Sequence, residues 1–404
     1  MALALVHDLR NPFAQRPELT AKPNARFTLN GTDALELRLE TICKEVLAGV
    51  QRIIPERKLE GIALGGGYGR GEGGVLKTPD GDLPYNDLEF YVLARGLPGW
   101  DERRYAKLLH ALSAELSPGA GIELEFKITS AARLRHTPQS LFYHDLILGH
   151  RWLLGGEELF AGCEQHREAG NIPLSEATRL LMNRCSGLLF ARGKLEHERF
   201  SDADADFVCR NLAKTELALG DAVLLAFGNY HWSCRERRRR MSDLSPAGDV
   251  TWLAEVRQRH AAGVKFKLQP HRFAESRAAL QAQFRDVSAL AWRVWLWLEN
   301  RRLGCGFRTA GDYATSQINK WPETSLWRNL LANFRVFGPQ ALWIRRKWRH
   351  PRERILNALV LLLWGRADAG VVSVVGSRAI HHELLMAESV ADVSAYRERW
   401  CRVG

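Results

Sequence analysis

Long apolar runs and a cysteine framework are both missing from this sequence. No segment of its 404 residues approaches the roughly 20 apolar residues that a membrane-spanning helix needs. The seven cysteines are scattered and odd in number, and no Cys-x-x-Cys pair occurs, which argues against a zinc framework and against disulfides. The first ten residues have neither a basic region before their short apolar run nor a small-residue cleavage site. We therefore expect a cytoplasmic protein with reduced thiols and no membrane span.

Internal repeats and low-complexity linkers are also lacking, so the whole length is available for packed domains. At 46% hydrophobic and 25% charged residues, the composition is that of an ordinary globular chain with two or three domains. The most apolar segment, from Leu356 to Trp364, lies beside arginines and is too short to span a bilayer. It predicts a buried core helix.

Charge is unevenly distributed along the chain. Residues 1–150 hold 18 Lys and Arg against 19 Asp and Glu, whereas residues 151–404 hold 39 against 27. The formal excess of +11 therefore comes from the second part. A basic surface suits nucleotide phosphates, nucleic acid or an anionic surface. The arginine run at 235–240 lacks interleaved aromatics, so it indicates a solvated helix end more than a nucleic-acid patch.

Two segments of the first part carry chemistry. In residues 61–72, GIALGGGYGRGE, a short apolar strand runs into a glycine turn, and in residues 86–92, NDLEFYV, a second strand displays Asp87 and Glu89. Alternate residues of a strand share one face, so this pair could hold a divalent metal. Gly66 and Gly67 would let the backbone approach a triphosphate.

The residues between the turn glycines have alternative interpretations. Arg70 could add a bidentate phosphate contact, or it could be a surface residue or a partner of Glu72. Tyr68 fits nucleotide contact and packing equally well. The spacing at 69–74 satisfies G-x-G-x-x-G, but Pro79, Gly81 and Pro84 forbid the helix that a dinucleotide site requires. No Gly-Lys-Ser/Thr follows, so a Walker loop is excluded.

The glycine turn and the Asp-x-Glu strand together resemble the signature of the nucleotidyltransferase superfamily. The sequence of residues 66–72 is similar to the loop of the protein-modifying uridylyltransferases and adenylyltransferases of nitrogen regulation. The resemblance covers residues 33–150. It departs from the family in residues 77–86, an insertion that could be a substrate lid or a sign that the chemistry is lost.

The resemblance implies the transfer of a nucleoside monophosphate from a nucleoside triphosphate to a hydroxyl of a protein or small molecule. Mg²⁺ or Mn²⁺ would be held by Asp87 and Glu89. A third carboxylate, Glu123 or Glu125, would complete the metal site or deprotonate the acceptor. The family also uses a basic residue of a helical domain to contact the phosphates, for which Arg184, Arg210 and Lys214 are the candidates. Each of these could instead be an exposed or ion-paired helix residue.

Periodicity predicts an α+β, nucleotidyltransferase-like core with a mixed sheet at 29–150, after an N-terminal extension at 1–28. A helix opens near Asn30, with Asp33 as its cap and Glu36 three residues on, and Pro55 closes it. The further elements expected are strands at 61–66, 87–94 and 121–128 and a helix at 101–116.

The remainder predicts a large all-helical region. We expect a helical domain at 151–268 and a Trp- and Arg-rich helical region at 269–404, whose aromatics suit a core, a protein interface or a substrate groove. The alternatives to catalysis are a nucleotide-binding protein that retains the fold, with its metal strand displaced by the insertion, and a nucleic-acid-binding protein. The nucleobase and the acceptor are not readable from the sequence.

Overall fold

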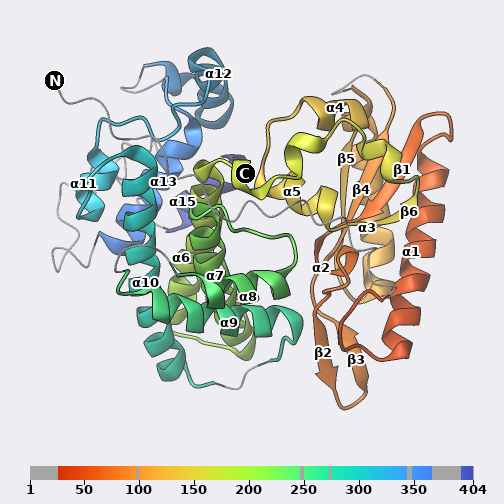
Figure 1. Ribbon diagram of the computed structural model, residues 1–404, viewed down its shortest axis with the longest axis horizontal. Coiled ribbons are helices and arrows are strands. Elements are labelled where there is room, and N and C mark those ends of the chain that lie inside the picture. The colour runs from red at the N-terminus through yellow and green to blue at the C-terminus, as the bar shows by residue number, and fades with distance from the viewer. Residues whose placement is uncertain are drawn as a thin grey trace.

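The computed structural model describes residues 26–96, 100–245, 250–272, 275–343, 348–365 and 393–403. Figure 1 shows a part that contains a β-sheet on the right and a larger helical part on the left. The protein is therefore α+β, as the sequence predicts. Of the predicted N-terminal extension, residues 1–25 lie outside the described residues.

The main sheet has four strands in the order β5-β4-β1-β6. Their bounds are Leu59–Leu64 for β1, Leu88–Ala94 for β4, Leu124–Thr129 for β5 and Arg151–Leu154 for β6. β1 is antiparallel to β4 and β6, whereas β4 is parallel to β5, so the sheet is mixed. Because β6 pairs with β1, the sheet extends past the boundary predicted at residue 150.

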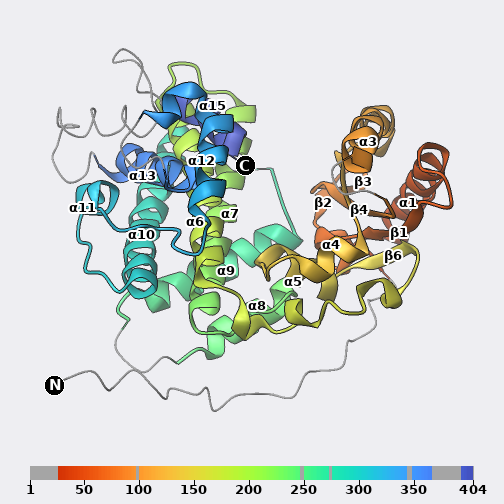
Figure 2. The same ribbon diagram turned by 90° about the horizontal axis from the view of Figure 1, so that it is seen from above.

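Helices cover both faces of this sheet (Figure 2). α1 (Asp33–Ile53) and α3 (Trp100–Ala120) share one hydrophobic core with Phe90 of β4. α4 (Ala131–His136) and α5 (Leu141–Leu148) share another with Tyr91, the next residue of the same strand. Successive side chains of a strand point to opposite faces, so β4 is held from both sides.

The start of α1 differs from the prediction. The cap is Thr32, whose Oγ1 accepts a hydrogen bond from Leu35 N at 3.4 Å, and not Asp33. Glu36 does not close a capping box, because its carboxylate accepts hydrogen bonds from the backbone N–H groups of Phe27 and Thr28, at 2.6 and 3.0 Å. The apolar residues spaced three and four apart along α1 face the core: Leu35, Leu39, Ile42, Val46 and Val50 are buried, and Ile53 is half-buried.

The insertion before Asp87 folds as a hairpin of β2 (Val75–Thr78) and β3 (Gly81–Pro84). Its Asp82 carboxylate accepts hydrogen bonds from Thr32 N at 2.8 Å and from Lys77 Nζ at 2.7 Å, which fixes the hairpin to the start of α1. The hairpin leaves β4 paired between β1 and β5, so the insertion does not displace the strand that follows it.

The helical part is built from long helices that share one core. Its helices are α6 (Leu174–Glu196), α7 (Asp202–Ala226), α8 (Cys234–Asp243), α9 (Leu253–Leu268), α10 (Arg277–Leu303), α11 (Ala310–Thr315), α12 (Leu326–Phe337), α13 (Pro351–Trp364) and α15 (Val393–Val403). A single hydrophobic cluster runs from Ile172 to Tyr396. The regions predicted at 151–268 and 269–404 are therefore packed together.

One prediction for this part is confirmed. Leu356 to Trp364 form the buried length of α13. In addition, none of the helices that the structure describes combines the length and the apolarity that crossing a bilayer demands.

Candidate functional site

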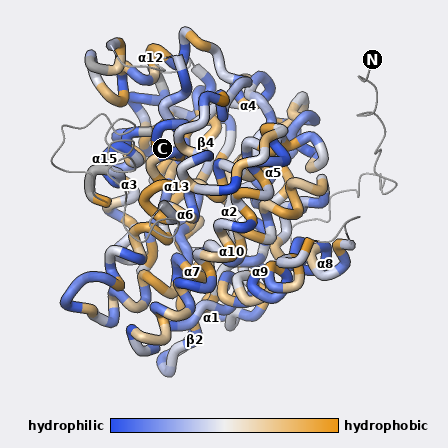
Figure 3. The backbone as a smooth tube through the Cα atoms, turned by 90° about the vertical axis from the view of Figure 1, so that its left-hand side faces the viewer, coloured by the Kyte–Doolittle hydropathy of each residue, from blue (hydrophilic) through white to orange (hydrophobic). Residues whose placement is uncertain are grey.

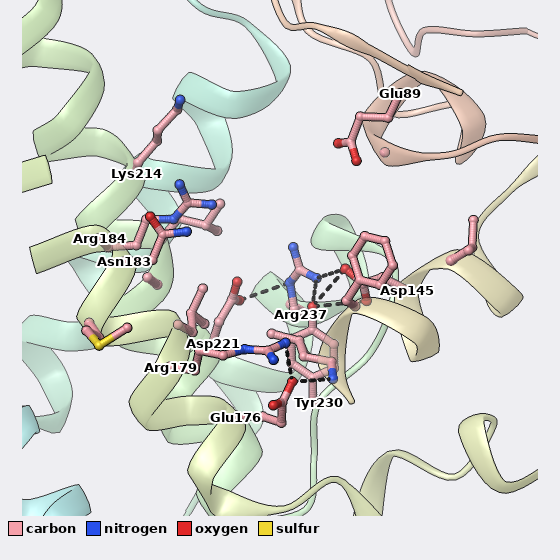
Figure 4. Close-up of a pocket in the computed structure, with 18 of the residues that line it drawn as sticks. Glu89, Asp145, Glu176, Arg179, Asn183, Arg184, Lys214, Asp221, Tyr230 and Arg237 are labelled. Atoms are coloured by element: carbon pink, nitrogen blue, oxygen red, sulfur yellow. Dashed lines mark hydrogen bonds and ion pairs between the residues drawn. The ribbon is translucent and has the colours of Figure 1, made fainter. Parts of the chain in front are cut away.

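A pocket of about 490 Å³ lies where the sheet part meets the helical part. The glycine turn, β4 and α5 contribute to its lining, and so do α6, α7, α8, α9, α13 and α15. Figure 4 shows Glu89 and Asp145 on one side of the pocket and Arg184 and Lys214 on the other. Its charged lining consists of Arg70, Arg179, Arg184, Lys214, Arg237, Lys267 and Arg352, with Glu89, Asp145, Glu176 and Asp221. Seven cationic groups against four carboxylates favour an anionic ligand.

The glycine turn forms a single helical turn, α2 (Gly66–Gly69), directly after β1. Gly66 lines the pocket and has a φ of +60°, a conformation that favours glycine. A Cβ atom at Gly66 would lie 2.8 Å from Glu89 Oε1, so the turn approaches β4 closely here. At Gly67 a Cβ atom would lie 3.1 Å from the carbonyl oxygen of Glu72, and this glycine packs inside the turn.

Tyr68 is a packing residue. Its side chain is buried, and its hydroxyl donates to the carbonyl of Gly74 at 2.8 Å and accepts from Tyr85 N at 3.0 Å. Burial raises the pKa of this phenol to about 12. Tyr68 does not line the pocket, so the predicted nucleotide contact is corrected: the ring instead joins the turn to the base of the hairpin.

Arg70 reaches the pocket from a buried network of charges. Its Nη1 lies 3.3 Å from Asp145 Oδ2 of α5, and the hydroxyl of Tyr230 donates to the same carboxylate at 3.1 Å. Arg237 of α8 donates to Tyr230 and forms an ion pair with Asp221 of α7 at 2.9 Å. These contacts fix the floor of the pocket, and Asp145 is the anionic partner of Arg70 in place of Glu72.

Glu72 joins the glycine turn to the helical part. Its carboxylate accepts hydrogen bonds from Ser233 Oγ at 2.5 Å and from Cys234 N at 2.9 Å, at the start of α8. Burial opposes its charge, but the nearby Arg70 and these hydrogen bonds outweigh burial and lower the pKa of Glu72. The last residue of the motif thus has a connecting role that the sequence does not reveal.

Glu89 points from β4 into the pocket (Figure 4). Its Oε2 accepts from Tyr91 OH at 2.6 Å and lies 3.4 Å from Lys127 Nζ. Burial opposes the charge of Glu89, yet Lys127 and Tyr91 lower its pKa. Glu125 is the register partner of Glu89 on β5, and its Oε2 lies 3.1 Å from the same Lys127 Nζ.

The other two predicted carboxylates lie just outside the strands. Asp87 precedes β4 and Glu123 precedes β5, and both are exposed. Asp87 has no hydrogen bond or ion pair to any other residue that the structure describes. Within the described ranges, no three His, Cys, Asp or Glu side chains gather as a ready set of metal ligands.

The opposite wall presents cations without partners. Arg184 of α6, Lys214 of α7 and Lys267 of α9 line the pocket, and none has a hydrogen bond or ion pair from its side chain to the described residues. Partial desolvation and the proximity of Arg184 lower the pKa of the exposed Lys214, and Asp87 opposes this shift. Burial lowers the pKa of Arg184, and the negative charges of Asp87 and Glu89 partly offset this lowering. These carboxylates and cations are therefore close enough to interact.

Arg210 does not belong to this wall. Its Nε lies 3.0 Å from Asp206 Oδ2, one turn earlier on α7, and it is not among the residues that line the pocket. Arg210 is therefore an ion-paired helix residue, which is the alternative that the sequence left open for it.

The far end of the pocket lies among α6, α13 and α15. Glu176 accepts from Leu141 N at 3.0 Å and from Arg179 at 2.8 Å. Arg352 and the half-buried Trp400 lie on the same lining. Arg352 has no hydrogen bond or ion pair from its side chain within the described part of the chain.

Several of these lining residues have no signal in the sequence. Asp145, Arg237, Lys267 and Arg352 lie in unrelated helices, and only tertiary packing brings them to the pocket. Lys127 stood out in the sequence only as a polar residue of the alternating strand. Its position between two carboxylates depends on the register of β4 and β5.

Searches against protein-family models, curated proteins and solved structures found no match to this chain.

Proposed function

We propose that this protein transfers a nucleoside monophosphate from a nucleoside triphosphate to a hydroxyl acceptor. The observation that carries the proposal is the opposition of Glu89 to the unpartnered cations Arg184 and Lys214 across one pocket, whose lining also includes the unpartnered Lys267. A volume of about 490 Å³ lies within the range of small-molecule sites, roughly 300–1,000 Å³. A triphosphate would supply anionic partners for these unpaired cations.

The cations bind and orient the phosphates in this proposal. Arg184 donates several N–H groups in a planar fork that suits phosphate oxygens, whereas Lys214 and Lys267 act as point charges. Fixed positive charge near the β- and γ-phosphates also stabilises the pyrophosphate that leaves. Gly66 leaves room beside Glu89 where a side chain would intrude.

The carboxylates at the edge of the sheet fit a divalent metal in part. Oxygen ligands suit Mg²⁺, and both Asp87 and Oε1 of Glu89 have no hydrogen bond from the described residues. Glu125 fits less well, because Lys127 already lies 3.1 Å from its carboxylate. Bound Mg²⁺ or Mn²⁺ would supply positive charge that polarises the α-phosphate.

The reaction balances as an in-line substitution at phosphorus. The acceptor oxygen forms a bond to the α-phosphorus, the bond from that phosphorus to the bridging oxygen breaks, and pyrophosphate leaves with the electron pair. The hydroxyl proton passes to a carboxylate at the edge of the sheet, for which the resemblance gives Glu123 or Glu125, two residues that do not line the pocket itself. The part of the acceptor remote from its hydroxyl would occupy the far end of the pocket, with Arg179, Arg352 and Trp400.

Incubation with each labelled triphosphate in turn, with Mg²⁺ or Mn²⁺, tests this function. We expect pyrophosphate release with at least one nucleotide, and label on the protein itself if the acceptor is one of its own side chains. Candidate alcohols are then added to find a small-molecule acceptor. Metal-dependent nucleotide binding without pyrophosphate release under any of these conditions would favour the non-catalytic alternative.

The nucleic-acid-binding alternative receives less support from the helical part. In α8, Arg239 forms ion pairs with Glu236 and Asp243, Arg240 pairs with Glu236, and Arg237 is buried. The arginine run is therefore largely neutralised. Affinity for DNA or RNA that falls steeply with salt would nevertheless favour this alternative.

A further inference from the structure

Helix α12 exposes most of its apolar side chains and buries two polar ones. Leu326, Trp327, Leu331 and Phe334 are exposed, with Trp327 at 70% and Leu331 at 59% of full exposure. Asn329 and Asn333 are buried, together with Val336 and Phe337 at the end of the helix. A helix of a globular protein normally turns its apolar stripe toward the core, so α12 has the reverse arrangement over most of its length.

Specific hydrogen bonds fix this orientation of the helix. Asn329 Nδ2 donates to Thr324 Oγ1 at 2.9 Å and to the carbonyl of Trp348 at 3.0 Å. Asn333 Nδ2 donates to the carbonyl of Arg349. Since these buried amides would lose their partners if the helix rotated, the apolar stripe stays on the outside.

Tryptophans extend the apolar stripe beyond the helix. The Trp327 and Trp348 rings pack edge to face with their centroids 5.1 Å apart, and Trp343 is 88% exposed. We call Leu326, Trp327, Leu331, Phe334 and Trp343 the α12 surface. In Figures 1 and 3, α12 lies at the upper edge of the molecule, so this surface is at the periphery.

The α12 surface lies in a basic stretch of the chain that is flanked by Glu323 and Glu353. Residues 324–352 contain seven Lys and Arg and no Asp or Glu. Arg328 and Arg335 are exposed on α12 itself, and the 3.6-residue period puts both on the same edge of the apolar stripe. Neither forms an ion pair with another residue that the structure describes.

We infer that the α12 surface binds the surface of an anionic lipid bilayer. Interfacial helices combine Trp, Phe and Leu on one side with Arg or Lys beside them, because the apolar side chains enter the acyl boundary while the cations remain among acidic headgroups. A second copy of the chain fits less well, since two copies placed face to face would bring the unpaired Arg328 and Arg335 of each copy close together. This inference is independent of the proposed reaction.

Flotation of the full chain with lipid vesicles tests the inference. We expect the protein to float with phosphatidylcholine vesicles that contain phosphatidylglycerol, to float poorly with phosphatidylcholine alone, and to dissociate as salt rises. The double variant Trp327→Ser/Leu331→Ser should bind anionic vesicles at least about tenfold more weakly, because losing more than about 1.4 kcal/mol of apolar burial corresponds to that factor. Arg328→Gln/Arg335→Gln should reduce the preference for anionic vesicles.

A matched control distinguishes binding by the α12 surface from non-specific adsorption of exposed apolar side chains to vesicles. Leu37 of α1 is 63% exposed on the sheet part, so Leu37→Ser removes an exposed leucine elsewhere and should leave vesicle binding unchanged. An unchanged melting temperature confirms that each variant is folded. Equal flotation with neutral and anionic vesicles, or an equal loss in the control, would overturn the inference. If light scattering showed a dimer for the wild type and a monomer for the Trp327→Ser/Leu331→Ser variant, the α12 surface would be a self-association interface instead.

Discussion

Glu72 and Ser233 are 161 positions apart in the chain, yet the Ser233 hydroxyl donates to the Glu72 carboxylate at 2.5 Å. The contact joins the end of the glycine turn to the start of α8. It holds the carboxylate wall of the pocket in a fixed place relative to the helical part, which supplies most of the cations.

Glu72→Gln should therefore destabilise the protein in a pH-dependent way. The folded pKa of Glu72 lies below its ordinary value of 4.5, so the charged carboxylate stabilises the fold above that pH and loses this effect as pH falls through the folded pKa. We expect a cost of about 1.5–3 kcal/mol at pH 7, typical of hydrogen bonds to a charged group. Urea unfolding at pH 7 and pH 4 measures it, and the difference between wild type and variant should narrow at the lower pH. If the difference in free energy of unfolding between wild type and variant were the same at both pH values, the charge of Glu72 would not be its cause.

Asp87→Asn should abolish pyrophosphate release while the fold survives. The substitution removes a charge with little change in volume, and Asp87 is exposed, without partners among the described residues, so stability should hardly change. Turnover with Mg²⁺ and the triphosphate is the measurement. Asp80→Asn, in the exposed hairpin turn, is the matched control and should remain active. Full activity of the Asp87 variant would remove this residue from the catalytic site.

Lys214→Met should weaken binding of the Mg²⁺-triphosphate by roughly ten- to a hundredfold. A charged hydrogen bond contributes about 1.5–3 kcal/mol, and each 1.4 kcal/mol corresponds to a factor of ten. Methionine keeps most of the apolar stem, so the melting temperature without ligand should hardly move.

Arg210→Met is the control for Lys214→Met. Arg210 lies one turn before Lys214 on α7, but it is paired with Asp206 and does not line the pocket. Calorimetric titration of both variants gives the comparison. If both lose affinity equally, general electrostatics is responsible, and a specific contact with Lys214 is wrong.

Gly66→Ala should impair nucleotide binding as well as stability. The left-handed conformation at φ +60° costs a residue with a Cβ atom about 1–2 kcal/mol, and the new atom would meet Glu89 Oε1 at 2.8 Å. Gly81 in the hairpin also has a positive φ, but a Cβ atom there meets nothing within 4 Å. Gly81→Ala therefore reports backbone strain alone. Urea unfolding and calorimetry on both variants should show lost stability in each and lost affinity only at Gly66.

Local sequence patterns predicted the parts of this structure that depend on neighbours along the chain. The apolar stripe of α1, the alternation of β5 and the buried α13 follow from periodicity. Gly66 and Glu89, the turn and strand residues singled out in the sequence, line the same pocket because β1 pairs with β4 and brings the turn after β1 beside the start of β4.

Tertiary packing decided what the sequence left open. Tyr68 lies inside the glycine motif, but its hydroxyl forms hydrogen bonds with Gly74 and Tyr85, on either side of the hairpin. The choice among Arg184, Arg210 and Lys214 depends on which face of each helix meets the sheet part, and only the first and the last line the pocket. Asp33 was expected to cap α1, yet Thr32 does so, and Glu36 does not close a capping box because residues 27 and 28 hydrogen-bond to it.

The placement of the pocket lining along the chain has a consequence for synthesis. Gly66 and Glu89 emerge from the ribosome first, Arg184, Lys214 and Lys267 follow over nearly two hundred residues, and Arg352 and Trp400 come last. The sheet part can fold early, since N-terminal units generally do so during translation. A nascent chain would thus display the carboxylates to solvent long before the cations that face them exist. Retention of a triphosphate should begin only once α9 is complete, and ribosome-arrested chains of increasing length would show the order in which this site is assembled.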